Sequence, residues 1–345
     1  MPAARVDVTV GDRTISLSNP DKPYFPELGD AGTKLTLARY YAAVSGALME
    51  TVGDRPTYLQ RYPDGIKGEE IYQKRLPPKA PEWLERVTIH FPSRRSAEVL
   101  RPSHPADFVW ATQFGTITFH PWPAHSDDLE HPDLMRIDLD PQPGTDFRDA
   151  ALVGVEVLKP MLESLNLVGY PKTSGSRGIH VDVPIQQKWT FAEVRRAVLA
   201  LAREMERVAP ERVTSAWWKE QRGERVFIDF NQMLSDRTIA SAYSVRPRPT
   251  ATVSTPLTWD EVPAADPLEF TMATVPQRLS SLGNIQADMS ADAGSLDELM
   301  AWVARDEERG LGEANYPPNY PKMPGEPPRV QPSKKQALNW ETPTE

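Results

Sequence analysis

The feature that most constrains the fold of this chain is a regular alternation of short apolar strands with helical segments in its central third. Stretches in which apolar and polar side chains alternate are separated by stretches whose apolar residues recur at helical spacing. The predicted order is strand, helix, strand, helix, strand, at residues 135–140, 146–165, 178–185, 190–208 and 225–230. Thr190 and Glu193 form a capping-box pattern at the start of the second helix. Such an alternation builds a sheet with helices packed against it.

The flanking regions add further strands and one long amphipathic helix. Before the central third we predict a hairpin at 5–17, helices at 34–52 and around 105–114, and strands at 56–62, 70–75, 86–91 and 117–122. Helical patterns continue from 256 to 310, whereas 316–345 contains 8 prolines. We therefore expect an α+β fold with a central mixed β-sheet flanked by helices, in one domain over residues 1–310. Residues 311–345 are expected to form a Pro-rich strap or disordered tail.

Composition excludes several classes of protein. The 345 residues include no cysteine, which excludes disulfides and thiolate metal sites, and no apolar run is long enough to span a bilayer. No signal peptide is recognisable at the N-terminus, so we expect a cytoplasmic protein with no membrane partner. The net charge of −9 belongs mainly to 251–345, where 15 acidic residues face 7 basic ones. Residues 55–101 and 188–250 are both net basic and are candidate surfaces for phosphate groups.

Paired carboxylates make the predicted strand at 135–140 a candidate metal site. In the strand at 135–140, the two-residue period of a strand places Asp138 and Asp140 on the same face. Like charges at that spacing repel each other unless a cation lies between them. Asp229 and Asp182 lie on neighbouring predicted strands, and the pattern leaves open which of them is the third carboxylate. Oxygen ligands of this kind suit Mg²⁺ or Mn²⁺, which serve phosphoryl and nucleotidyl transfer.

A glycine-rich turn precedes the strand at 178–185. The segment "KTSGSRGIHVDV" (172–183) combines two glycines, three hydroxyl residues and Arg177, a composition that suits a turn able to hold phosphate oxygens. His180 follows on the polar face of the strand. The turn does not match a P-loop, which runs from strand to helix and ends in Gly-Lys-Ser/Thr. Together with the aspartates, it indicates a nucleotide-phosphate site.

Three motifs in this order resemble a known family. The segments "IDLDPQPG", "KTSGSRGIHVDVP" and "FIDFNQ" resemble the motifs of the archaeo-eukaryotic primase superfamily, and most closely the polymerase module of bacterial ligase D, the non-homologous end-joining enzyme. Further segments, including "RYPDGIKGEEIYQKR" and "AYSVRPRPTATVSTPLTWDEV", extend the resemblance over about 15–265. The resemblance implies the primase-polymerase fold, with residues 1–310 as the catalytic domain.

The resemblance also assigns roles to individual residues. It implies that the catalytic, metal-binding carboxylates are Asp138, Asp140 and Asp229, which favours Asp229 over Asp182. The implied nucleotide-binding residues are Ser174, Arg177, His180 and Arg246, with Arg177 in place of a lysine that is common in the family. The implied DNA-binding residues are Lys22 and Lys34, for a 5′-phosphate, together with Arg61, Lys74 and Gln232. Gln73 and His120 occupy further matching positions, and Tyr72 is expected either to stack on a base or to pack in the core.

The resemblance therefore implies a template-dependent DNA repair polymerase of the primase type. We expect it to fill short gaps by two-metal nucleotidyl transfer with Mn²⁺ or Mg²⁺, to use NTP or dNTP substrates with a preference for ribonucleotides, and to act in end joining or excision repair. Its expected partners are gapped or broken duplex DNA with a 5′-phosphate, end-joining proteins and a separate DNA ligase, since the sequence carries no ligase lysine motif or nuclease module. Work on DNA implies a nucleoid-associated location.

Two alternative functions are also consistent with the carboxylates. A two-metal nuclease or phosphohydrolase would also need the carboxylates, but it would not need a triphosphate site. A non-catalytic DNA-end-binding module would retain its affinity for DNA after the aspartates are removed.

Overall fold

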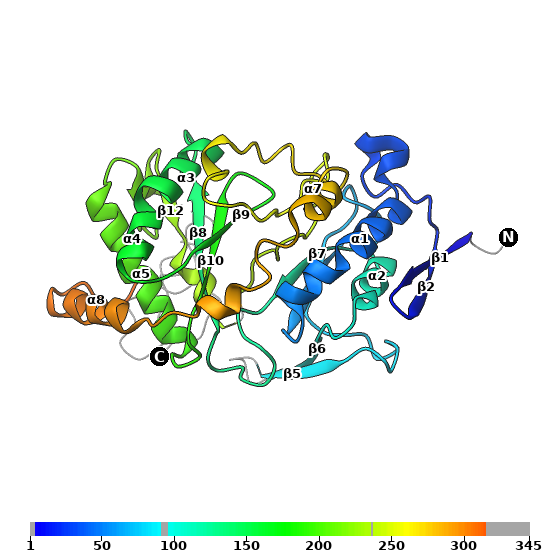
Figure 1. Cartoon of the computed structure of the whole chain (residues 1–345), viewed down its shortest axis with the longest axis horizontal. Coiled ribbons are helices and arrows are strands. Elements are labelled where there is room, and N and C mark those ends of the chain that lie inside the picture. The colour runs from blue at the N-terminus through cyan, green and yellow to red at the C-terminus, as the bar shows by residue number, and fades with distance from the viewer. Residues whose placement is uncertain (1–3, 91–95, 236, 315–345) are drawn as a thin grey trace, which may run out of the picture.

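The computed structural model of the chain describes residues 4–90, 96–235 and 237–314. The strands of this part form three sheets (Figure 1). A hairpin joins β1 (Arg5–Val10) and β2 (Arg13–Ser18). The second sheet has the order β4-β3-β6-β5, with β7 also paired to β3, and its strands are β3 (Thr57–Arg61), β4 (Ile71–Gln73), β5 (Arg86–His90), β6 (Ser96–Leu100) and β7 (Thr116–Pro121). The central sheet has the order β11-β12-β8-β10-β9, and its strands are β8 (Leu134–Pro141), β9 (Tyr170–Thr173), β10 (Ile179–Pro184), β11 (Val213–Thr214) and β12 (Val226–Ile228).

The central sheet is mixed and is covered by helices on one face. Its neighbouring strands pair antiparallel, except that β11 and β12 are parallel. The apolar side chains of β8 and β10, including Ile137, Leu139 and Val181, lie in one core with apolar side chains of the helices. These helices are α3 (Phe147–Val153), α4 (Lys159–Ser164) and α5 (Phe191–Val208), and α8 (Asp297–Glu308) packs on α5 (Figure 1). The predicted α+β fold with a central mixed sheet and flanking helices is thereby confirmed.

A second core lies under the N-terminal helices. Helices α1 (Lys34–Val52) and α2 (Ala106–Gln113) pack together and against the hairpin and β7. Tyr41 and Phe119 meet edge to face there, with ring centres 5.0 Å apart. Two short helices complete the set, α6 (Lys219–Arg222) and α7 (Val275–Leu282), together with 3₁₀ turns that include η3 (Phe230–Met233). None of the helices in the described ranges combines the length and apolar character that crossing a membrane requires.

The structure departs from the sequence-based expectation in the helix predicted over 146–165. That helix is divided into α3 and α4 by a π-turn at Gly154–Leu158, where the Lys159 N–H donates to the Gly154 carbonyl five residues back. Pro160 follows at once, and it has no N–H with which to continue the normal helical pattern. Strands β6, β9 and β11 were not expected. Helix α5 does begin after the predicted capping box of Thr190 and Glu193.

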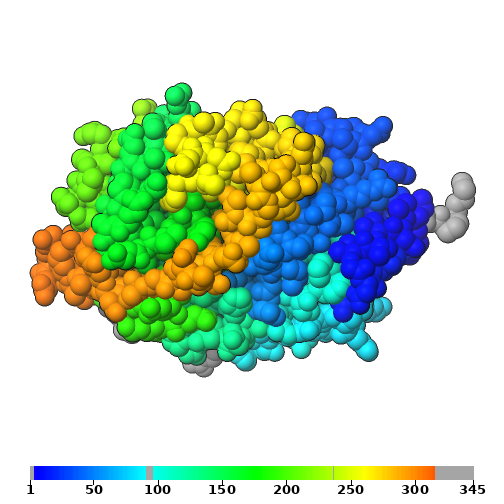
Figure 2. Space-filling model, in the orientation of Figure 1, coloured from blue at the N-terminus to red at the C-terminus, as the bar shows by residue number. Residues whose placement is uncertain are grey.

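One stretch of irregular chain, which we call the linking segment (residues 241–257), joins the two sheets. On one side, the Thr118 Oγ1 of β7 donates to the Val245 carbonyl over 2.7 Å. On the other side, the Thr173 N–H of β9 donates to the Thr255 carbonyl over 2.9 Å. Beyond it, residues 258–264 lie against the helices of the central sheet, and the chain from α7 to residue 314 then crosses the face seen in Figure 2, from the N-terminal half to the far end of the central sheet. Residues 311–314 reach α5, whereas 315–345, most of the predicted Pro-rich tail, lie outside the described residues.

Candidate active site

The polar face of the central sheet collects the predicted carboxylates. Strand residues opposite each other in a pair point to the same face, and Asp138 lies opposite His180 in the β8–β10 register. Asp140 lies opposite Phe227 of β12, and the residue after β12 is Asp229, whose N–H donates to the Asp138 carbonyl over 3.1 Å. Because side chains alternate along a strand, Asp138, Asp140 and Asp229 share one face, opposite the apolar core.

Two of these carboxylates approach each other closely. The Gln232 Nε2 atom donates to Asp229 Oδ2 over 3.0 Å and to Asp138 Oδ2 over 3.4 Å. Burial, and then the charges of Asp229 and Asp140, raise the pKa of Asp138 well above its ordinary value. Burial also raises the pKa of Asp229. The site is therefore a focus of negative charge that a cation would relieve.

The donor set fits a hard divalent ion by its chemistry. All three predicted ligands are carboxylates, and the Asp138 side chain retains 15% of its exposure, so an ion can reach it. Over the described ranges, no three carboxylate, imidazole or thiolate groups already surround one point closely enough to hold a metal ion. Instead, the Gln232 amide lies between Asp138 and Asp229. An ion bound by both carboxylates would take the place of this amide.

Asp182 has partners that Asp229 lacks. Its carboxylate lies 3.7 Å from Arg136 Nε and 3.7 Å from Lys172 Nζ, and all three side chains are buried. Asp182 therefore balances two buried cations, so it is a poor candidate for a metal ligand. The strand pattern alone did not distinguish Asp182 from Asp229, whereas the family resemblance favoured Asp229.

Lys172 is a buried cation that the sequence analysis did not single out. Its Nζ lies 2.9 Å from His180 Nδ1, and burial lowers the pKa of Lys172 to about 8. Lys172 lies opposite His180 in the β9–β10 register, so the strand period places it on the polar face. The signal was present in the segment "YPKT", but β9 itself was not predicted.

His180 lies between the lysine and the carboxylates. Burial, and then the charges of Lys172 and Arg246, lower the pKa of His180 well below its ordinary value, so the imidazole is neutral. The Lys172 ammonium can only donate, so Nδ1 accepts and the ring proton sits on Nε2. The Nε2 atom lies 3.6 Å from Asp138 Oδ1. His180 therefore presents an N–H donor to the carboxylate side of the site.

The glycine turn is closed by Ser174. Its Oγ accepts from the Ser176 N–H over 3.2 Å and from the Gly178 N–H over 3.1 Å. These two backbone N–H groups of the predicted phosphate-binding turn are thus already paired with the serine. Arg177 is exposed and has no hydrogen-bond or ion-pair partner within the described ranges.

Gly175 brings the turn against Arg246. Its φ of 66° lies in the left-handed region, and an added Cβ would fall 2.4 Å from the Cγ of Arg246. The Thr252 Oγ1 donates to the Gly175 carbonyl over 2.7 Å, which fixes the turn to the linking segment. The Nε of Arg246 is buried without a hydrogen-bond partner in the described residues, and burial lowers the pKa of Arg246. The Arg246 guanidinium therefore lies beside the turn, and its Nε–H is not hydrogen-bonded to any described residue.

Apart from Gln232, the predicted DNA-binding residues have their recorded contacts outside the carboxylate group, and they form two groups. Lys34 is buried, its Nζ donates to the Ser18 carbonyl and to Gln113 Oε1, both over 3.0 Å, and burial lowers its pKa to about 8. Lys22 is near enough for its charge to contribute to that shift, and its Nζ lies 2.6 Å from Asp64 Oδ1. Arg61 donates through Nε to the Phe114 carbonyl over 2.8 Å.

The second group is Lys74 with the aromatic side chains around it. Lys74 lies over the ring of Tyr58 at 4.9 Å. Tyr72 is 41% exposed and meets Tyr58 and His120 edge to face, with ring centres 6.0 and 5.3 Å away. The exposure of Tyr72 favours the expectation that it stacks over the alternative that it packs in the core. Gln232, expected to contact DNA, lies instead among the carboxylates.

Comparison with known proteins gives consistent matches. The family model described as "LigD, primase-polymerase domain" matches residues 33–286. The multifunctional non-homologous end joining protein LigD of Mycolicibacterium smegmatis is 29% identical over 290 residues, which cover 84% of this chain and 38% of the relative. The Pseudomonas aeruginosa protein of the same description is 31% identical over 307 residues, covering 86% of this chain and 35% of that protein.

A solved structure also matches. The polymerase domain from Mycobacterium tuberculosis Ligase D in complex with DNA superimposes with a TM-score of 0.76 at 27% sequence identity, over 82% of this chain and all of that one. The chain spans less than two fifths of the length of these two curated relatives.

Proposed function

The chain belongs to the LigD primase-polymerase domain family, whose members are DNA-directed nucleotidyltransferases, and from that premise we propose that it is a template-dependent DNA repair polymerase that fills short gaps during end joining. The observation that carries the proposal is the group of three aspartates on one face of the central sheet, beside a glycine turn and an arginine with unused donor capacity. We assign this activity to residues 1–310.

We assign metal binding to the carboxylate group. Asp138, Asp140 and Asp229 would hold two Mn²⁺ or Mg²⁺ ions, whose charge would lower the pKa of a primer 3′-OH and offset the charge on the departing pyrophosphate. The pKa of Asp138 is raised first by burial and then by the charges of Asp229 and Asp140, and this crowding of carboxylates supports the assignment, because a bound cation would relieve it. Gln232 would release its shared hydrogen bonds to the two carboxylates when the ions bind.

We assign triphosphate binding to the glycine turn and to the side chains of His180 and Arg246. The neutral ring of His180 keeps Nε2–H as a donor, which suits a phosphate oxygen. Arg246 brings a guanidinium whose Nε has no partner in the described residues, and exposed Arg177 brings a second. Ser174 holds the turn between them in shape and has its own hydroxyl proton to donate.

We assign the DNA to the N-terminal half and to Gln232 beside the carboxylates. Lys22 and Lys34 would bind a 5′-phosphate, and Arg61, Lys74 and Gln232 would contact the DNA nearer the carboxylates. The match to a polymerase domain solved with DNA supports a duplex partner. The family resemblance supports a preference for ribonucleotides, a separate DNA ligase and end-joining proteins as partners, and a place at the nucleoid.

Primer extension tests the proposal. The substrate is a duplex with a short gap and a 5′-phosphate, supplied with ATP or dATP in Mn²⁺ or Mg²⁺. We expect wild type to extend the primer, and the double variant Asp138→Ala plus Asp140→Ala to fail. Glu298→Ala, which changes an exposed residue of α8, serves as a control that should retain activity. No extension by wild type, or undiminished extension by the double variant, would refute the proposal, whereas loss of labelled DNA without added nucleotide would indicate a nuclease.

A further inference from the structure

The chain beyond the family match contacts the turn that carries Asp229. The family model ends at residue 286, and α8 with the residues that follow it lies outside the match. We propose that residues 311–314 brace the 3₁₀ turn η3 through the buried side chain of Arg195, and so act as a positioning element for the carboxylate of Asp229.

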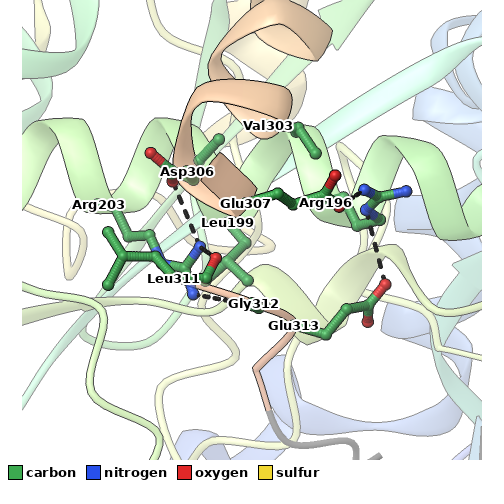
Figure 3. Close-up of a pocket in the computed structure, with 10 residues that line it drawn as sticks. Arg196, Leu199, Arg203, Val303, Asp306, Glu307, Leu311, Gly312 and Glu313 are labelled. Atoms are coloured by element: carbon green, nitrogen blue, oxygen red, sulfur yellow. Dashed lines mark hydrogen bonds and ion pairs between the residues drawn. The ribbon is translucent and has the colours of Figure 1, made fainter. Parts of the chain in front are cut away.

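Helix α5 holds this segment with arginines. Figure 3 shows Arg203 and Arg196 pointing from α5 toward the end of α8 and the residues after it. Arg203 donates to the Leu311 carbonyl over 2.9 Å and to the Gly312 carbonyl over 2.6 Å. Arg196 pairs with Glu307, and its Nε lies 3.6 Å from a carboxylate oxygen of Glu313. The segment is therefore fixed to α5 through its backbone and through an acidic side chain.

Arg195 carries the contact inward. Its side chain is fully buried, and its guanidinium donates to Glu313 Oε2 over 3.1 Å and to the Ala314 carbonyl over 3.0 Å. Its Nε donates to Asn231 Oδ1 over 2.8 Å, and the group lies 5.2 Å from the ring centre of Phe230. A guanidinium without contact to water needs a counter-ion and a full set of acceptors. Glu313 supplies that counter-ion from outside the family match.

Asn231 connects Arg195 to Asp229, the proposed metal ligand. Its side chain accepts from Arg195, while its backbone N–H donates to Asp229 Oδ1 over 3.1 Å. The same turn carries Gln232, which donates to Asp229 Oδ2. Both oxygens of Asp229 are thus oriented by η3, and Arg195 holds η3 in place. Groups that orient metal ligands in this way change metal affinity when they are lost.

Two charge-removing variants separate bracing from simple packing. Glu313→Ala removes the counter-ion of Arg195, and Glu313→Gln removes its charge at constant size. Glu307→Ala is the matched control, because it removes an ion pair between α8 and α5 without touching Arg195. The Glu313 and Glu307 side chains are 38% and 51% exposed, so we expect the full chain to fold in each case.

The first readout needs no metal. The N–H groups of Asn231 and Gln232 are hydrogen-bonded to Asp229, and that of Leu234 to the Asn231 carbonyl. We expect their hydrogen exchange to be about tenfold faster in Glu313→Ala, with a smaller effect in Glu313→Gln. Glu307→Ala should exchange there as wild type does. Unchanged exchange in Glu313→Ala, or an equal increase in Glu307→Ala, would overturn the inference.

The second readout rests on the proposed function, since it assumes that Asp229 binds metal. Titration with Mn²⁺, followed by electron paramagnetic resonance of the free ion, should show weaker binding to Glu313→Ala by about 3- to 10-fold, with the KM for nucleotide unchanged. Equal Mn²⁺ affinity in wild type and Glu313→Ala would contradict positioning of the ligand. If wild type neither binds Mn²⁺ nor extends a primer, the proposed function fails, and hydrogen exchange still decides whether the brace exists.

Discussion

Neutralising Asp138 should make the metal-free protein more stable while it abolishes the proposed activity. Asp138 Oδ2 and Asp229 Oδ2 lie 3.4 and 3.0 Å from one nitrogen, so the two oxygens are at most 6.4 Å apart. Two unit charges at that distance repel by about 2.5 kcal/mol at an effective dielectric constant of about 20. Asp138→Asn removes this repulsion and keeps an acceptor for Gln232. At about 2.1 cal/mol/K of unfolding entropy per residue, the gain corresponds to a Tm about 3 °C higher.

The pH dependence follows from the direction of the shift. Because the pKa of Asp138 is raised above its ordinary value of 3.8, the folded state holds the proton more tightly than the unfolded chain does. The stability of wild type therefore falls as pH rises from about 3.8 through the raised pKa, and it stays lower above it. The advantage of Asp138→Asn should be absent at acidic pH, grow through this window and be complete above it.

Thermal melts at several pH values, without metal and with Mn²⁺, provide the measurement. Mn²⁺ should raise the Tm of wild type more than that of Asp138→Asn. Asp182→Asn is the matched control on the same face, and it should lower stability by about 3 kcal/mol because it leaves Arg136 and Lys172 without their carboxylate. If Asp138→Asn is no more stable than wild type at pH 8 without metal, or if both variants shift Tm in the same direction, the electrostatic reasoning is wrong.

Three further changes test other parts of the site and fold. Gly175→Ala forces a side chain into a left-handed backbone and against Arg246, so urea unfolding should show a loss of about 1 to 2 kcal/mol. Arg246→Gln removes a buried cation, so Tm should not fall, while the KM for nucleoside triphosphate should rise about tenfold. In wild type, two 2.7 Å hydrogen bonds from Arg278 hold the pKa of Glu261 at about 2, and Glu261→Gln removes the charge and one of the two acceptor oxygens. Wild type should lose the stability from this pair between pH 4.5 and about 2, and the variant should lack that slope.

The polar face of the central sheet was largely readable from the sequence. A strand has a period of two residues, so the alternation in "RIDLDP" was enough to place Asp138 and Asp140 together. Pattern alone could not distinguish Asp182 from Asp229, because the difference lies in neighbours on other elements. Arg136 and Lys172 neutralise Asp182, and Lys172 is brought there by β9, a strand of four residues with little alternation to reveal it.

Contacts between distant parts of the chain were beyond sequence reasoning. Arg195 lies in the helix predicted over 190–208, where nothing local set it apart, yet it is fully buried and meets Glu313, 118 positions further on. The family resemblance likewise assigned Lys34 to a 5′-phosphate, but nothing in the sequence indicated that its Nζ is held by the Ser18 carbonyl and Gln113. In both cases the burial of a charged group depends on the tertiary acceptors around it, which no local pattern encodes.

The linking segment makes the two halves of the molecule dependent on each other at the very place where nucleotide is proposed to bind. Arg246 and Thr252 belong to it, Thr252 holds the Gly175 turn, and the same few residues bond β7 in one half and β9 in the other. A separation of the halves would therefore pull Arg246, the proposed triphosphate ligand, away from the Gly175 turn. Bound triphosphate should consequently hold the linking segment and the Gly175 turn together. It should slow proteolytic cleavage within 241–257 more than cleavage elsewhere.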